Sequence, residues 1–160
     1  MKRIIALLLS ALLLVAVFTG CGDNKKEFTC QDLTMTVPGN MKDVSSNSSF
    51  SSFTFALDSS KLAIFGLKEK FSAFDGADMT LKDYADAVIA ANKYDALAIT
   101  RSNADYIYFT YEAQLEAGLF KYVAGCFKGS DAFWLVQFGA PATNFELETC
   151  LGYLDTVKLS

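Results

Sequence analysis

Alternating apolar and polar residues predict that most of the chain after residue 27 forms β-strands. Leu33, Met35 and Val37 alternate with threonines, which is the pattern of a strand with one buried face. The preceding segment 28–30 is expected to pair with it across a tight turn at Gln31-Asp32. The same reading places further strands at residues 50–57, 61–68, 96–100, 106–115, 119–128 and 132–139, and loops at 44–49 and 71–79.

Two segments have the longer period of a helix. Thr80 followed by Asp83 resembles an N-terminal capping box, and the apolar residues after it predict a helix that runs to about Asn92. A closing helix is expected after Pro141, with Asn144 as its cap.

The segment 132–139, AFWLVQFG, is apolar on both faces, as is the middle of the strand before it. A strand that is buried on both sides needs a layer of structure on each side. The expected fold class is therefore α+β, an antiparallel β-sheet with helices packed on both faces in a three-layer sandwich.

The amino terminus has the order of an export signal. Lys2-Arg3 precedes an apolar run, residues 4–18, which ends at Thr19-Gly20-Cys21. The run is shorter than the roughly 20 residues that a helix needs to cross a bilayer. V-F-T-G-C resembles the lipobox of bacterial lipoproteins. The resemblance implies cleavage between Gly20 and Cys21, a diacylglycerol thioether on Cys21, and often a further acyl chain such as palmitate on the new amino terminus.

The alternative is an ordinary secretory signal with a chance cysteine at the cleavage site. On the lipoprotein interpretation the chain divides into a signal peptide (1–20), a lipidated tether (21–27) and one folded domain (28–160). Two or three acyl chains hold a protein stably at a bilayer. We therefore expect the mature protein at the cell membrane, lipid-anchored and facing outside the cytoplasm.

Charge excludes one large class of partners. Without the signal, 12 of the 14 basic residues remain against all 18 acidic ones, a net charge of −6. Such a chain repels nucleic-acid phosphates, so we expect no nucleic-acid binding.

Catalytic signatures are missing. The sequence contains no histidine, no glycine-rich phosphate loop and no nucleophile elbow. An acidic group, Asp75, Asp78, Asp83 and Asp86, lies around the start of the first helix but lacks the alternation of a calcium loop. It is either a solvated helix start or a weak cation site. We expect no cofactor, no metal and no enzymatic activity.

Cysteines and aromatic residues leave alternatives open. Cys30, Cys126 and Cys150 all lie in apolar stretches and are expected to pack in the core, although one bridge among them is allowed in an exported protein. The later strands carry many aromatic residues, for which core packing and ligand contact are both possible. Tyr106 and Tyr108 lie on the more polar face of their strand and are the candidate partner surface.

Three patterns resemble the PsbP-like family: the opening L-T-M-T-V-P with Met41, the helix start T-L-K-D-Y-A-D, and the closing F-E-L-E-T-C-L-G-Y-L-D-T-V. These small α+β domains occur in the extrinsic subunit of the plant oxygen-evolving complex and in many bacterial lipoproteins. The resemblance implies the fold but supplies no site residues.

The sequence therefore predicts an anchored, exported lipoprotein with a non-enzymatic module that binds a protein or envelope component. A small-molecule or cation-binding module is the alternative, and an enzyme that relies on carboxylates alone is a third possibility.

Overall fold

The computed structural model describes residues 24–59, 61–74, 79–102 and 104–160. The predicted signal, the lipidation site at Cys21, and Asp75 and Asp78 lie outside them. The elements are β1 (Lys25–Cys30), β2 (Leu33–Pro38), β3 (Lys42–Asp43), η1 (Ser48–Phe50), β4 (Phe55–Asp58), β5 (Ala63–Lys70), η2 (Phe71–Ala73), α1 (Leu81–Asn92), β6 (Ile99–Thr100), β7 (Ile107–Leu115), β8 (Gly118–Lys128), β9 (Ala132–Pro141), α2 (Leu147–Leu154) and β10 (Lys158–Leu159).

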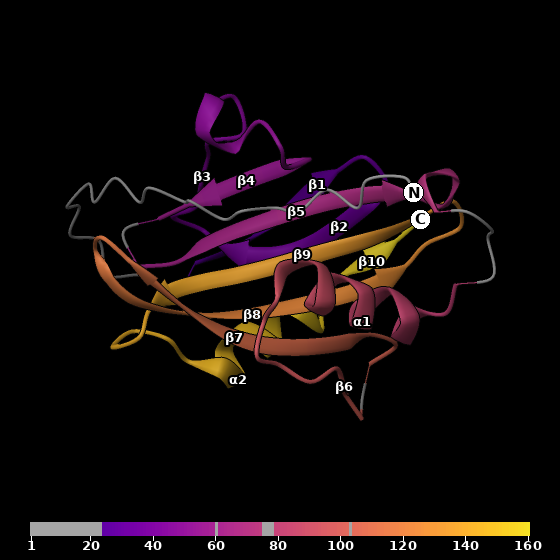
Figure 1. The fold of residues 1–160 in the computed structure, drawn as a ribbon. Coiled ribbons are helices and arrows are strands. Elements are labelled where there is room, and N and C mark those ends of the chain that lie inside the picture. The colour runs from indigo at the N-terminus through magenta and orange to yellow at the C-terminus, as the bar shows by residue number, and fades with distance from the viewer. Residues whose placement is uncertain (1–23, 60, 75–78, 103) are drawn as a thin grey trace.

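The strands form two antiparallel sheets. The larger has seven strands in the order β3-β4-β5-β9-β8-β7-β6, and the smaller has three in the order β1-β2-β10. Helix α1 covers one face of the large sheet, and α2 lies with the small sheet against the other face (Figure 1). The expected α+β sandwich is confirmed, with the small sheet sharing one of the outer layers.

Strands β8 and β9 lie at the centre of the large sheet. Every residue from Ala132 to Ala140 is buried, as is every residue from Tyr122 to Phe127. Because adjacent side chains point to opposite faces, this burial requires cover on both sides. The reading of 132–139 as a strand that is apolar on both faces was therefore correct.

Two large cores result, beside a small cluster of Ala56, Ala63 and Phe65 at the β4–β5 end of the sheet. The first lies between the large sheet, the small sheet and α2, and includes Leu33, Met35, Trp134, Phe138 and Leu154. The second lies under α1 and includes Tyr84, Ala85, Phe109, Tyr111 and Phe133.

An ion pair joins the small sheet to the large one. Lys68 Nζ of β5 lies 2.8 Å from Asp32 Oδ1 in the β1–β2 turn and 3.4 Å from Asp131 Oδ1 in the β8–β9 turn. The hydrogen bond to Asp32 raises the pKa of Lys68. Burial opposes ionisation of Asp32, but the hydrogen bond from Lys68 holds the pKa of this carboxyl below its usual value. The pair therefore stays charged at neutral pH and links both turns to β5.

The capping box of α1 is confirmed. Thr80 Oγ1 accepts from the Asp83 backbone N–H at 3.1 Å, and the Asp83 carboxylate accepts from the Thr80 N–H at 3.0 Å. Lys93, in the left-handed conformation with φ of 56°, ends the helix. No helix among the described residues is long and apolar enough to cross a membrane.

Several predicted boundaries were wrong. The strand expected at 50–57 begins only at Phe55, because Phe50 and Phe53 lie three residues apart on a turn and both pack on Phe65. The strand expected at 96–100 shortens to Ile99–Thr100.

The first strand and the last helix also differ from the prediction. The closing helix starts at Leu147 rather than after Asn144, because the Asn144 N–H closes a turn onto the Pro141 carbonyl. At the amino end, β1 already begins at Lys25, because residues 25–27 pair with the end of β2. The last three residues of the predicted tether therefore belong to the fold.

A glycine in β5 makes room for an aromatic ring. Gly66 pairs directly with Phe55, whose ring lies over it and contacts Phe28 at 4.8 Å between ring centroids. A Cβ at Gly66 would overlap that ring.

Gly66→Ala is therefore expected to lower the free energy of unfolding by about 1–3 kcal/mol, the usual cost of overpacking. Urea unfolding followed by circular dichroism measures it. Gly152→Ala is the matched control, since nothing lies within 4 Å of a Cβ at this exposed position of α2, and it should stabilise by about 0.5–1 kcal/mol. Equal effects of the two substitutions would contradict this account of Gly66.

Candidate functional site

Tyr106 does not face outward, so its assignment to the partner surface was wrong. Its side chain is 2% exposed, contacts Phe127 at 4.9 Å between ring centroids, and donates a hydrogen bond of 2.9 Å from its hydroxyl to Asp155 Oδ1. Burial and the neighbouring carboxylate raise the pKa of this phenol. Tyr108 is half-buried against the same core. The structure covers this face with α2 only at the end that holds Tyr106 and Tyr108, whereas Thr110, Glu112 and Gln114 further along the strand are exposed. The alternation of residues in one strand cannot reveal such cover.

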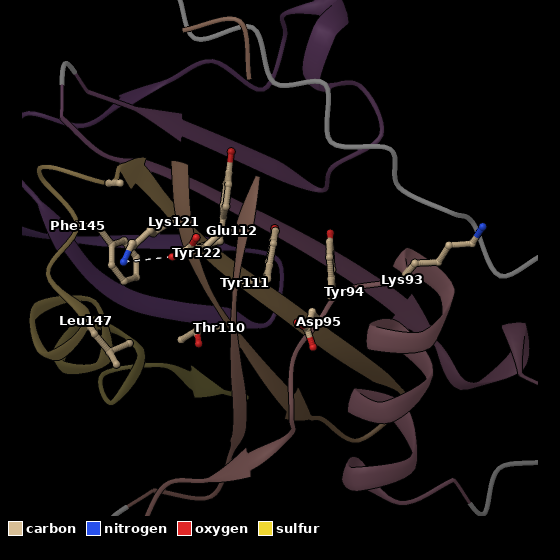
Figure 2. Close-up of a pocket in the computed structure, with 11 residues that line it drawn as sticks. Lys93, Tyr94, Asp95, Thr110, Tyr111, Glu112, Lys121, Tyr122, Phe145 and Leu147 are labelled. Carbon is tan, nitrogen blue, oxygen red and sulfur yellow. Dashed lines mark ion pairs between the residues drawn. The ribbon is translucent and has the colours of Figure 1, made fainter. Parts of the chain in front are cut away.

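Three other tyrosines form a stack on the opposite face of the sheet. The ring centroids of Tyr94 and Tyr111 lie 3.9 Å apart, and those of Tyr111 and Tyr122 lie 4.8 Å apart, with interplanar angles of 14° and 4°. Tyr111 and Tyr122 come from β7 and β8, whereas Tyr94 follows the end of α1. Figure 2 shows the rings in a row with their hydroxyls on the same side.

The stack is held from beneath by the sheet. Tyr122 pairs directly with Gly139, where a Cβ would overlap its ring. The Tyr111 hydroxyl donates a hydrogen bond of 2.6 Å to Oε1 of Gln137, the buried polar residue in the centre of β9. Burial raises the pKa of Tyr122 to about 12 and that of Tyr111 well above its usual value. Both are therefore neutral phenols at physiological pH.

A hollow of about 780 Å³ lies beside this stack along the outer edge of β7. The end of α1 forms one wall and the segment between β9 and α2 forms the other, with β7 between them (Figure 2). The lining residues are Lys93, Tyr94, Asp95, Thr110, Tyr111, Glu112, Lys121, Tyr122, Ala142, Phe145 and Leu147. The hollow therefore touches both outer layers of the sandwich and is the candidate functional site.

The backbone of β7 is open along most of this hollow. Strand β6 pairs only with Ile107 and Tyr108. From residue 109 onward, no backbone group of the described residues pairs with the outer side of β7. Such an edge leaves N–H and C=O groups available for another extended chain.

The direction of these groups follows from one hydrogen bond. The Arg101 N–H donates to the Tyr106 carbonyl at the outer edge. Because successive residues of a strand point their backbone groups to opposite sides, Thr110, Glu112 and Gln114 also point theirs outward. Thr110 and Glu112 are residues that line the hollow.

Asp83 and Asp86, the described members of the acidic group around α1, do not form a cation site. Asp83 is engaged in the capping box, and Asp86 Oδ2 lies 2.6 Å from Lys82 Nζ. Among the described residues, no group of three cysteine or acidic side chains is placed to hold a metal ion.

Cys30, Cys126 and Cys150 are free thiols, so the described cysteines form no bridge among themselves. Cys126 and Cys150 are buried, and burial raises the pKa of Cys150 to about 12. Core packing is thus confirmed for these two.

Sequence reasoning missed Tyr94. The aromatic character of the later strands included Tyr111 and Tyr122, but Tyr94 reaches them only because α1 ends at Lys93 and turns the chain back over the sheet. The periodic pattern of apolar residues ends with the helix, so it does not predict the surface on which the next residue packs.

Two packed layers around an antiparallel sheet, in this strand order, define the class: the chain has a PsbP-like α+β fold. One similar structure is cyanobacterial PsbP (CyanoP) from Synechocystis sp. PCC 6803, with a TM-score of 0.57 and 10% identity over 91% of this chain and 99% of that chain. Another comes from Bacteroides thetaiotaomicron VPI-5482, with a TM-score of 0.60 and 12% identity over 87% of this chain and 49% of that chain.

The chain thus spans about half the length of the Bacteroides protein. At these identities the likeness concerns the fold alone. No protein-family model and no curated protein matches the sequence.

The hydrogen bond between Tyr111 and Gln137 generates a stability prediction. Tyr111→Phe leaves the buried Gln137 Oε1 without this donor, so we expect the free energy of unfolding to fall by about 1–3 kcal/mol. Tyr108→Phe is the control, because no hydrogen bond links the Tyr108 hydroxyl to another described residue, and it should change stability by less than about 0.5 kcal/mol. Chemical denaturation of both variants measures the difference, and equal stabilities would contradict the role given to Tyr111.

Proposed function

We propose that this chain is an exported lipoprotein, anchored through Cys21, whose PsbP-like domain binds a protein or another component of the cell envelope without catalysing a reaction. The observation that carries the proposal is the hollow along β7, where an open strand edge, tyrosine rings and charged side chains come together.

The anchor rests on the order of residues at the amino terminus. Cys21 lies four residues before Lys25, the first residue of β1, so the intervening chain spans at most about 14 Å. With so short a tether, a lipidated Cys21 would hold the domain against the bilayer surface. Its partner is then sought among molecules of the same envelope.

Binding is favoured over catalysis by the chemistry of the hollow. The sequence supplies no histidine, and the lining carboxylate of Glu112 lies 3.2 Å from Lys121 Nζ in an exposed ion pair. The lining tyrosines are neutral phenols that hydrogen-bond and pack. These groups recognise a ligand, but they do not form a nucleophile with an activating base.

A small-molecule-binding module is the second candidate. The volume of the hollow, about 780 Å³, lies in the range of ligand pockets. If the chain binds a small molecule, we expect a compact ligand beside Tyr94 and Tyr111. A protein partner would instead extend along the edge of β7.

The anchor is tested on Cys21→Ala with labelled palmitate in growing cells. We expect the wild-type chain to incorporate the label and Cys21→Ala to incorporate none, because the acyl chains depend on the lipidated cysteine. In the same cells, crosslinking followed by mass spectrometry should join the anchored chain to an envelope protein through residues that line the hollow.

Cys30→Ala is the matched control and should be labelled like the wild type. Equal labelling of Cys21→Ala, or a purified chain that retains Met1, would contradict the anchor. Crosslinks confined to other faces of the domain would contradict the assignment of the hollow as the binding site.

A further inference from the structure

We propose that the partner binds as an extended, basic peptide that adds a strand to the outer edge of β7. This inference rests on the proposed binding function and specifies the chemistry of the partner. Strand addition uses the main chain for affinity and alternate side chains for specificity.

The backbone of the β7 edge is open to an added strand. Thr110, Glu112 and Gln114 present their N–H and C=O groups outward, and no described residue pairs with them through its backbone. An extended polypeptide is the complement of such a row, because its own groups repeat at the same spacing.

Strand β7 differs from the other sheet edges in length and in its surroundings. Strand β3 has only two residues, and β10 likewise. The edge of β1 is longer, but the hollow does not reach it. At β7, the wall from α1 and the wall from the β9–α2 segment stand on either side of the space that a new strand would occupy (Figure 2).

The charges around the hollow indicate the chemistry of the partner. The lining itself is balanced, with Lys93 and Lys121 against Asp95 and Glu112. The acidic excess comes from α2 and its two ends, where Glu146, Glu148 and Asp155 lie near Arg101. Lys121 pairs with Glu112 at 3.2 Å, and Arg101 lies 2.9 Å from Asp155 and 3.7 Å from Glu148. Glu146, between the lining residues Phe145 and Leu147, is exposed and adds to the excess. Basic side chains of the partner therefore fit this side.

The other side of β7 favours apolar residues. A partner residue directly opposite Tyr111 places its side chain on the same face of the sheet, next to Tyr94 and Tyr111. Partner residues opposite Thr110 and Glu112 place theirs toward α2 and its carboxylates. The expected sequence alternates basic residues with aliphatic or aromatic ones.

The test uses a labelled peptide, Lys-Val-Lys-Tyr-Lys-Val-Lys, and the chain purified in the form that the cells produce. Binding is measured by fluorescence anisotropy, and hydrogen exchange is followed at the amides of β7 and β1. We expect slowed exchange at Thr110 and Glu112, because their N–H groups become hydrogen-bonded.

Backbone methylation separates strand addition from simple charge attraction. One peptide is methylated at the backbone nitrogens of its lysines, and another at the backbone nitrogens of its other residues. Charge and side chains are unchanged in both. We expect one of the two to lose at least about tenfold in affinity and the other to bind nearly as well, since only alternate N–H groups face β7. Equal affinity of both would overturn the proposal.

Thr110→Pro removes one outward N–H and should weaken binding about fivefold to tenfold, the value of one hydrogen bond. Proline is tolerated at such an edge position. Thr29→Pro is the matched control. The Gly39 N–H donates to the Asn24 carbonyl within the β1–β2 pair, so Thr29, five residues on, points its N–H away from β2. This variant should bind the peptide like the wild type.

The outcomes for the two proposals are distinct. If crosslinking captures an envelope protein equally with the wild type and with Thr110→Pro, the binding function stands and strand addition at β7 is wrong. A different outcome is that only one of the two methylated peptides loses affinity, but no cellular protein crosslinks to the hollow. The proposed function is then wrong, while strand addition at the β7 edge stands. Unchanged exchange at Thr110 and Glu112 with saturating peptide overturns the strand-addition proposal directly.

Discussion

The structure depends on the burial of β8 and β9 on both faces. Their side chains are apolar on either side of the sheet, and leaving one face in water would expose much of the core. One face is covered by α1 and the other by α2 with the small sheet. Gly125 permits the close approach on the second face, since a Cβ there would lie 2.9 Å from the Leu154 side chain. The rest of the chain is arranged to supply these two layers.

Much of this architecture could be predicted from the sequence. The run from Ala132 to Gly139 indicated a strand that needs two covering layers, and the pattern around Thr80 predicted a capped helix that the structure confirms. Both signals are local, because the run of apolar residues and the capping box each involve residues close together in the chain. The closing helix was predicted, but its start was not, because Asn144 takes part in a turn instead.

The candidate site was much less predictable. Tyr106 and Tyr108 looked exposed because neighbouring strand positions are polar, yet the distant helix α2 covers the end of the face where both lie. Tyr94 joins Tyr111 through the path that the chain takes after α1. Which edge of a sheet remains open depends on the strand order, and strand order is set by contacts between distant segments. A single sequence carries no direct record of such contacts.

The same two layers that bury the central strands also shape the hollow. The end of α1 and the start of α2 project past β7 on opposite faces, so the open edge lies between two walls (Figure 2). On this account the partner binds at an open edge of the sheet, beside the buried core. The proposed lipid anchor at Cys21 determines only where the open edge of β7 meets a partner.

Native-state hydrogen exchange tests the central claim most directly. If burial of β8 and β9 on both faces holds the fold together, the amides of Val136 and Ala124 exchange only through global unfolding, with an opening free energy equal to that from denaturation. Amides at the β1 edge, such as Thr29, exchange through much smaller openings. Exchange of Val136 or Ala124 with an opening free energy several kcal/mol below the global value would contradict the account.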